Sequence, residues 1–166
     1  MKRNFLLIAA FVGGLLFASC GENKDTLVKD TDEMFTQAET DLQGIDNLDD
    51  FFAFRDGMDT KKDDLIQKIM DTYNISDTEE DLPEAVTQIL DRVEAYNLKE
   101  DAKYVELLSP LLESMETAIA NGDKEAAKEA YTTMQKYSDY DLPSEEVEER
   151  CSKIIAGLFE LGVIEQ

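Results

Sequence analysis

Apolar residues recur every three or four positions along almost the whole chain after residue 26, and this spacing limits the fold more than any other feature. Such steps place side chains on one face of an α-helix. The β-branched residues occur at the same steps and never alternate as they do in a half-buried strand. The first apolar face consists of Leu27, Val28, Thr31, Met34, Phe35, Ala38, Leu42 and Ile45. We therefore predict an all-α protein, an antiparallel up-down bundle of five or six helices.

Short polar signals mark where the helices begin. Asn47, with Asp50 three residues later, is suited to cap a second helix, whose apolar residues become sparse midway along it. The tripeptide Asp-Leu-Pro occurs at 81–83 and again at 141–143. We predict that these tripeptides open a third helix and the last helix, because proline suits a first helical turn. Asp123, which follows an Asn-Gly pair, is suited to cap the helix in between.

Two residues leave the course of the third helix open. Asn97 is suited to break or bend it, with a further helical stretch following. Pro110 lies inside that stretch. It either kinks the helix or lies in the first turn of a new helix that Ser109 caps. Both arrangements agree with the apolar spacing, so the predicted number of helices is five or six.

The first 19 residues have the organisation of a secretory signal. Lys2 and Arg3 provide a short positive segment, and a charge-free run of 13 residues follows at positions 5–17. This run is too short to cross a bilayer, which requires roughly 20 apolar residues. Small residues then lead into a cysteine, in the sequence Ala-Ser-Cys at positions 18–20.

This Ala-Ser-Cys sequence resembles the lipobox of bacterial lipoproteins, in particular those of the Bacteroidetes type. In that family the cysteine thiol is acylated with fatty acids such as palmitate and the chain is cut before it. The resemblance implies that Cys20 begins the mature chain and anchors it, and Gly21 in place of aspartate implies sorting to the outer membrane, on its periplasmic face or the cell surface. Two or three acyl chains anchor stably, since each buried CH₂ contributes about 0.8 kcal/mol. The alternative is an ordinary cleaved signal followed by an incidental cysteine.

These features divide the chain into a cleaved signal at 1–19, a lipidated tether at 20–26 and a single acidic helical-bundle domain at 27–166. The chain has 16 basic and 38 acidic residues, a net charge of −22. Cleavage removes two of the basic residues and no acid, so the mature charge is −24. Such a chain repels phosphate groups, which excludes nucleic acid as a partner and keeps the domain away from anionic lipid headgroups.

The side chains that most often perform catalysis are scarce. The sequence has no histidine, the commonest general base and metal ligand, and no tryptophan. If Cys20 is lipidated, Cys151 is the one remaining thiol and no intramolecular disulfide can form. Its place on an apolar stripe predicts a core position. We therefore predict a protein that is not an enzyme and that has no cofactor or metal site.

Part of the mature chain is similar to a known helical family. The run AIANGDKEAAKEAYTTMQKYSDY, residues 118–140, resembles the last helical hairpin of the soluble b-type cytochrome four-helix bundles. Residues 38–65 are loosely similar to the first hairpin of that family. The family binds haem through a methionine and a histidine, and this chain has no histidine. The resemblance therefore implies a related bundle without the haem.

Two groups of residues are candidates for binding or modification. Tyr131, Tyr137 and Tyr140 lie close enough in sequence to form an aromatic patch that could line a ligand groove. The favoured interpretation is that their rings close the core while the hydroxyls reach water. Asp-Thr-Leu at 25–27 resembles the short O-glycosylation motif of exported Bacteroidetes proteins, which would modify Thr26.

The sequence predicts a non-enzymatic, lipid-anchored module that binds a partner protein or ligand at the cell envelope. One alternative is a carboxylate-based enzyme such as a glycan hydrolase, which needs two carboxyl groups about 5–10 Å apart in a pocket. Another is a carrier of a divalent cation or small ligand in the bundle interior. The apolar helix faces contain no inward-facing polar cluster, which disfavours the carrier, and no calcium-binding loop is complete.

Overall fold

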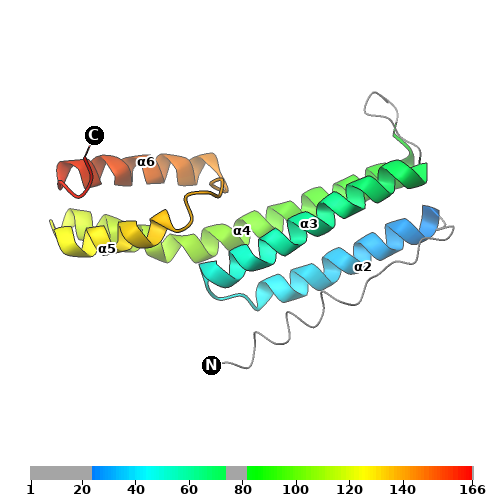
Figure 1. The fold of residues 1–166 in the computed structure, drawn as a ribbon, viewed down its shortest axis with the longest axis horizontal. Coiled ribbons are helices and arrows are strands. Elements are labelled where there is room, and N and C mark those ends of the chain that lie inside the picture. Colours follow the sequence, from blue (N-terminus) through cyan, green and yellow to red (C-terminus); the bar gives the residue numbers. More distant parts are fainter. Residues whose placement is uncertain (1–23, 74–81, 166) are drawn as a thin grey trace.

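The computed structural model of the chain describes residues 24–73 and 82–165. This part of the chain forms five α-helices and no strand, which confirms the prediction of an all-α helical bundle (Figure 1). In Figure 1 the chain turns back between α2 and α3, between α4 and α5, and between α5 and α6. The helices are α2 (Lys24–Gln43), α3 (Leu48–Tyr73), α4 (Glu84–Ala120), α5 (Lys124–Gln135) and α6 (Glu145–Glu160).

Helix α4 is the common element of two groups of helices. It has 37 residues and is therefore about 55 Å long. Figure 1 shows α2 and α3 beside its first part and α5 and α6 beside its last part. We call α2, α3 and the first part of α4 the N-terminal group. The last part of α4, with α5 and α6, is the C-terminal group.

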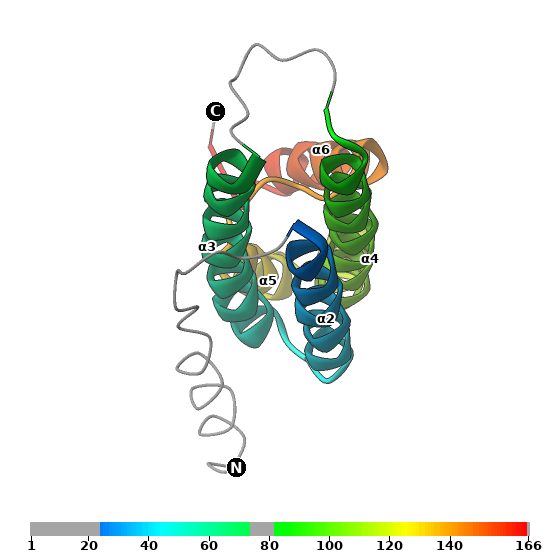
Figure 2. The ribbon, with the colours of Figure 1, turned by 90° about the vertical axis from the view of Figure 1, so that its right-hand side faces the viewer.

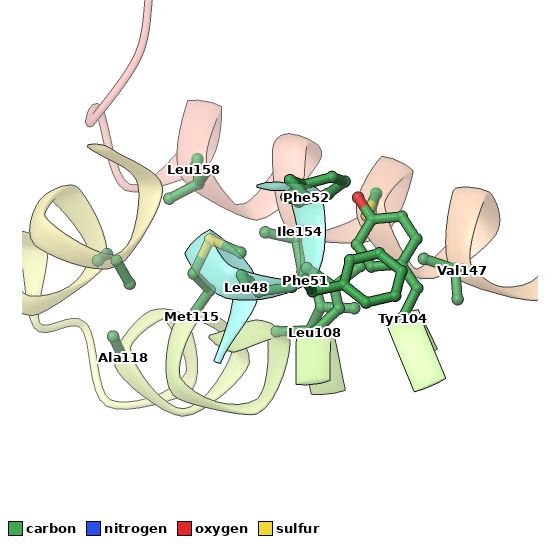
Figure 3. Packing of buried hydrophobic residues seen from close by; sticks show 14 of the residues in the cluster. Leu48, Phe51, Phe52, Tyr104, Leu108, Met115, Ala118, Val147, Ile154 and Leu158 are labelled. Atoms are coloured by element: carbon green, nitrogen blue, oxygen red, sulfur yellow. The ribbon is translucent and has the colours of Figure 1, made fainter. Parts of the chain in front are cut away.

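Each group has its own hydrophobic core. The N-terminal core contains Leu27, Phe35, Ala38, Met58, Leu65, Ile69, Val86, Ile89 and Tyr96. The C-terminal core is larger and also includes Ile45, which lies between α2 and α3. Leu48, Phe51 and Phe52, in the first turns of α3, pack in this core with residues of α4 and α6 (Figure 3). The two groups are thus joined at the start of α3. Other members of the C-terminal core are Tyr104, Leu108, Leu112, Met115, Val147, Cys151, Ile154 and Leu158.

The helix starts follow the polar signals in the sequence. The backbone N–H of Asp50 donates to Asn47 Oδ1 at 2.9 Å, and the Asn47 amide donates back to the Asp50 carboxylate at 2.8 Å. Asp123 accepts from the backbone N–H of Ala126 at 3.1 Å, as predicted. The last helix begins later than the tripeptide at 141–143, because Ser144 caps it by accepting from the Val147 N–H at 3.3 Å.

Of the two alternatives at Asn97, a break between two helices is wrong, because α4 runs through this residue without interruption. Pro110 also lies inside α4, and Ser109 does not cap a new helix but donates its hydroxyl to the Val105 carbonyl at 2.8 Å. An interior proline costs about 3 kcal/mol. Burial of Leu108 and Leu112, each 1% exposed on either side of it, offsets that cost.

Candidate functional site

The predicted anchor and the predicted glycosylation site lie at the start of the chain. Cys20 lies outside the described residues. Thr26 is exposed in the first turns of α2, whereas the neighbouring Leu27 is only 2% exposed and belongs to the N-terminal core. A glycosylating enzyme that recognises the Leu27 side chain would therefore have to act before this core forms. Among the residues that the structure describes, no helix is both long enough and apolar enough to cross a bilayer.

Two of the three predicted patch tyrosines come together on α3. Tyr137 and Tyr140 lie in the segment between α5 and α6, and their rings stack on Phe52 with centroid distances of 5.2 and 3.7 Å. The Tyr137 hydroxyl donates to Asp49 Oδ1 at 2.9 Å, and the Tyr140 hydroxyl lies 3.3 Å from Asp56 Oδ2. The segment between α5 and α6 is thus fastened to the first turns of α3.

These rings continue a set of buried aromatic side chains. Phe51 stacks on Tyr104 at 5.3 Å, and Phe52 meets the edge of the same ring at 5.1 Å (Figure 3). We call Phe51, Phe52, Tyr104, Tyr137 and Tyr140 the aromatic junction. Because Phe52 is only 4% exposed, these stacked rings close the core, which is the favoured interpretation of the sequence for Tyr137 and Tyr140.

Tyr131 does not join the junction. It is half-buried on α5 and packs against the C-terminal core. Within the described part of the chain, no ring contact links Tyr131 to Tyr137 or Tyr140. The structure therefore brings together two of the three predicted tyrosines, and their rings contact the core residue Phe52.

The junction hydroxyls are donors at neutral pH. Burial, together with the hydrogen bond to the Asp49 carboxylate, raises the pKa of Tyr137 to about 12. Burial and the nearby Asp56 carboxylate likewise raise the pKa of Tyr140. Neither phenol ionises under ordinary conditions, so neither is suited to act as a base or a nucleophile.

The expectation that no polar cluster faces inward is wrong. Glu100 is only 3% exposed on α4, and its carboxylate lies 3.1 Å from Lys62 Nζ and 3.9 Å from Arg55 Nε, both on α3. The Tyr96 hydroxyl donates to the same carboxylate at 3.2 Å. We call Arg55, Lys62, Tyr96 and Glu100 the Glu100 cluster. A buried carboxylate with these partners is stable, because each opposite charge and hydrogen bond compensates for its lost hydration.

Two features of the sequence could have revealed this cluster. Glu100 lies four residues after Tyr96 and four before Tyr104, so that helical spacing places it on the buried face of α4. Arg55 and Lys62 are seven residues apart and share one face of α3, in the region where the apolar residues become sparse. A charged residue on one apolar stripe opposite two cations on another indicates a buried ion pair.

A second set of ion pairs joins α2 to α4. Arg92 lies 2.9 Å from the Asp32 carboxylate and 2.6 Å from that of Glu39, and Lys99 lies 2.6 Å from the other oxygen of Glu39. Burial would raise the pKa of Glu39, but the hydrogen bonds from Lys99 and Arg92 outweigh burial and hold that pKa below its usual value. In the C-terminal group, Arg150 on α6 contacts both carboxylate oxygens of Glu116 on α4, at 2.6 and 2.8 Å.

The remaining reactive groups are poorly placed for chemistry. Cys151 is 4% exposed, as predicted for a core residue, and burial raises the pKa of its thiol. Glu113 and Asp123 line an open hollow of about 430 Å³ along α4 and α5, but both side chains are exposed. Residues 24–73 and 82–165 contain no group of three or more histidine, cysteine, aspartate or glutamate side chains arranged to hold a metal ion.

Comparisons with known proteins give no match. No protein-family model matches the chain, and neither the curated proteins nor the solved structures include a significant match.

Proposed function

We propose that this chain is a lipid-anchored, non-enzymatic helical module at the outer membrane of a bacterial cell envelope, and that it binds a partner protein. The observation that carries the proposal is the position of Cys20. It directly follows a charge-free run of signal-peptide length and two small residues, and an acidic, water-compatible chain follows it. An acylated cysteine at this position would hold the helices outside the cytosol.

The chemistry of the helical body supports a binding role over catalysis. An enzyme that works with two carboxyl groups needs one whose pKa is raised, so that it can donate a proton. Among the described carboxyl groups, every resolved pKa shift is downward, at Glu39, Glu116 and Glu149, because each is hydrogen-bonded to a basic side chain. These groups remain ionised at neutral pH and serve as partners in ion pairs.

The proposal is tested by replacing Cys20 with serine in a host that processes bacterial lipoproteins. We expect the wild-type chain in the membrane fraction with incorporated palmitate, and the Cys20→Ser chain unlabelled and released from the membrane. Cys151→Ala is the matched control, since this buried thiol is no lipid acceptor, and it should leave labelling and fractionation unchanged. Membrane retention of Cys20→Ser at the wild-type level would contradict the anchor.

Partner binding is tested separately, by chemical crosslinking of the full chain in intact cells followed by gentle extraction. A reproducible crosslinked species that contains one other envelope protein is the expected result. Recovery of the chain alone, at crosslinker concentrations that capture known envelope complexes, would contradict partner binding and leave the anchor intact.

A further inference from the structure

Helix α3 exposes an apolar residue on the edge that it shares with α4. Ile66 is 49% exposed, whereas the adjacent Leu65 is 7% exposed in the N-terminal core. Ile66 lies one turn after Lys62, which reaches across to Glu100 on α4. The side chain of Ile66 is therefore on the α4 side of α3, outside the core.

Helix α4 exposes an apolar residue along the same edge. Arg92 marks the side of α4 that faces α2, because it pairs with Asp32 and Glu39 there. Leu90, two residues earlier, lies about 160° around the helix from Arg92 and is 41% exposed. Val93, three residues after Leu90, is partly buried against the N-terminal core, so the exposed Leu90 side chain continues into that core through Val93. We call Ile66, Leu90 and Val93 the α3–α4 face.

The position of this face relative to α6 indicates a helix as its occupant. In Figure 2, α2 lies on one side of the pair formed by α3 and α4, and α6 lies behind the pair toward the other side. Figure 1 shows that α6 runs along the last part of α4 and does not extend along α3 beyond its first turns. The N-terminal group thus has three helices, and a fourth laid against the α3–α4 face would complete a four-helix arrangement.

The charges around the face indicate the chemistry of that helix. Asp63 lies three residues before Ile66 and Glu94 lies four residues after Leu90, so both flank the apolar residues. Neither carboxylate forms an ion pair with another residue of the described ranges. Asn97 follows Leu90 by seven residues on the same side of α4, and its buried side-chain oxygen accepts no hydrogen bond.

We propose that the α3–α4 face binds one amphipathic helix of a partner protein, with apolar residues along one side and lysines or arginines on the flanks. This inference rests on the proposed partner-binding function and names the surface that serves it. A second copy of the chain is the weaker occupant, because two mature molecules, each with a net charge of −24, repel each other. A basic helix is attracted by the same charge and pairs with Asp63 and Glu94.

The probe is a fluorescent synthetic helix with leucines at positions i, i+3, i+4 and i+7 and lysines on both flanks. Binding to the full-length mature chain in detergent micelles is followed by fluorescence anisotropy. We expect the double substitution Ile66→Gln with Leu90→Gln to weaken binding at least tenfold. Ile155→Gln is the matched control, since Ile155 is 41% exposed, as Leu90 is, but lies on α6 in the C-terminal group and away from the face, and it should change the affinity less than twofold.

Circular dichroism of each variant checks that the fold is retained, which is expected because all three side chains are exposed. The proposal is overturned if the helix does not bind, or if Ile155→Gln weakens binding as much as the double substitution does. It is also overturned if the chain alone forms a dimer in sedimentation that the double substitution dissociates, since the occupant is then a second copy. None of these results removes the anchor or the crosslinked envelope partner, which are measured independently.

Discussion

The two groups of helices that share α4 are held together by different interactions. In the N-terminal group, ion pairs cross from α2 and α3 to α4, and one of them, Glu100 with Lys62, is buried. In the C-terminal group the contacts are mainly apolar and aromatic, with the Arg150–Glu116 pair at the edge. We infer that burial supplies the stability of both groups, whereas the charges of the N-terminal group specify how its long helices align.

The need for such alignment follows from helix length. Helices α2 and α3 have 20 and 26 residues, and an apolar stripe of that length could shift by one turn along α4 with little loss of burial. A shift of α3 would separate Lys62 from Glu100 and leave a charge buried without a partner. That penalty is several kcal/mol, although the correctly formed pair contributes little net stability.

The largest expected effect comes from the aromatic junction. Phe51 is fully buried between Phe52 and Tyr104, so Phe51→Ala leaves a cavity and should lower the free energy of unfolding by about 4 kcal/mol. Chemical denaturation followed by circular dichroism measures this loss. Ile66→Gln on the exposed edge of α3 is the control and should change stability by less than about 0.5 kcal/mol. A loss below about 1 kcal/mol for Phe51→Ala would show that the junction does not hold the groups together.

The Glu100 cluster gives the next largest effect and tests the role of charge in the N-terminal group. Glu100→Ala leaves Lys62 and Tyr96 without their buried partner and should cost about 3 kcal/mol. The double substitution Lys62→Met with Glu100→Leu removes both charges and should recover most of that loss. Glu116→Gln, at a more exposed pair, should cost less than about 1 kcal/mol. If the double variant is no more stable than Glu100→Ala, the cluster does not act as a charge pair.

The sequence predicted the parts of this fold that depend on local chemistry. The apolar stripes and the caps at Asn47 and Asp123 were all recognisable, because each depends on residues within one helix. The continuity of α4 through Asn97 and Pro110 was not, since tertiary packing on both sides of these residues overrides their local preferences. The Glu100 cluster was also missed, because its cations come from a different helix about forty residues earlier.

The candidate binding residues illustrate the same limit. Tyr137 and Tyr140 were identified correctly as neighbours, but their partner Phe52 is far away in sequence and turns the patch into a core contact. The α3–α4 face likewise depends on how two helices are rotated. Exposure of Ile66 and Leu90 could not be read from apolar spacing, because each directly follows a buried apolar residue of its helix, Leu65 or Ile89.

Asn97 offers a smaller, stabilising change in the N-terminal group. Its side-chain oxygen is buried without a hydrogen bond in the part of the chain that the structure describes. Asn97→Leu removes this unsatisfied acceptor and favours the helix, so we expect the free energy of unfolding to rise by about 1 kcal/mol. Thermal unfolding would show a higher midpoint, whereas a lower midpoint would mean that the amide has a partner that must be preserved.

The smallest effect is a dependence on alkaline pH that belongs to the C-terminal group. Folding raises the pKa of Tyr137 to about 12, so its contribution is complete below the unfolded value near 10 and is lost as pH rises from there through 12. Tyr137→Phe removes the hydrogen bond to Asp49, should cost about 1 kcal/mol at neutral pH, and should flatten this decline. An identical decline between pH 10 and 12 in wild type and variant would assign it to another group.

The anchored module requires a mature chain that starts at Cys20 and carries lipid there, and mass spectrometry of the protein from native membranes measures both directly. We predict an N-terminal peptide that begins at Cys20 and is heavier than its amino acids by the mass of a diacylglycerol, with or without a third acyl chain. A peptide that begins at another residue, or an unmodified Cys20, would contradict the anchored module proposed above.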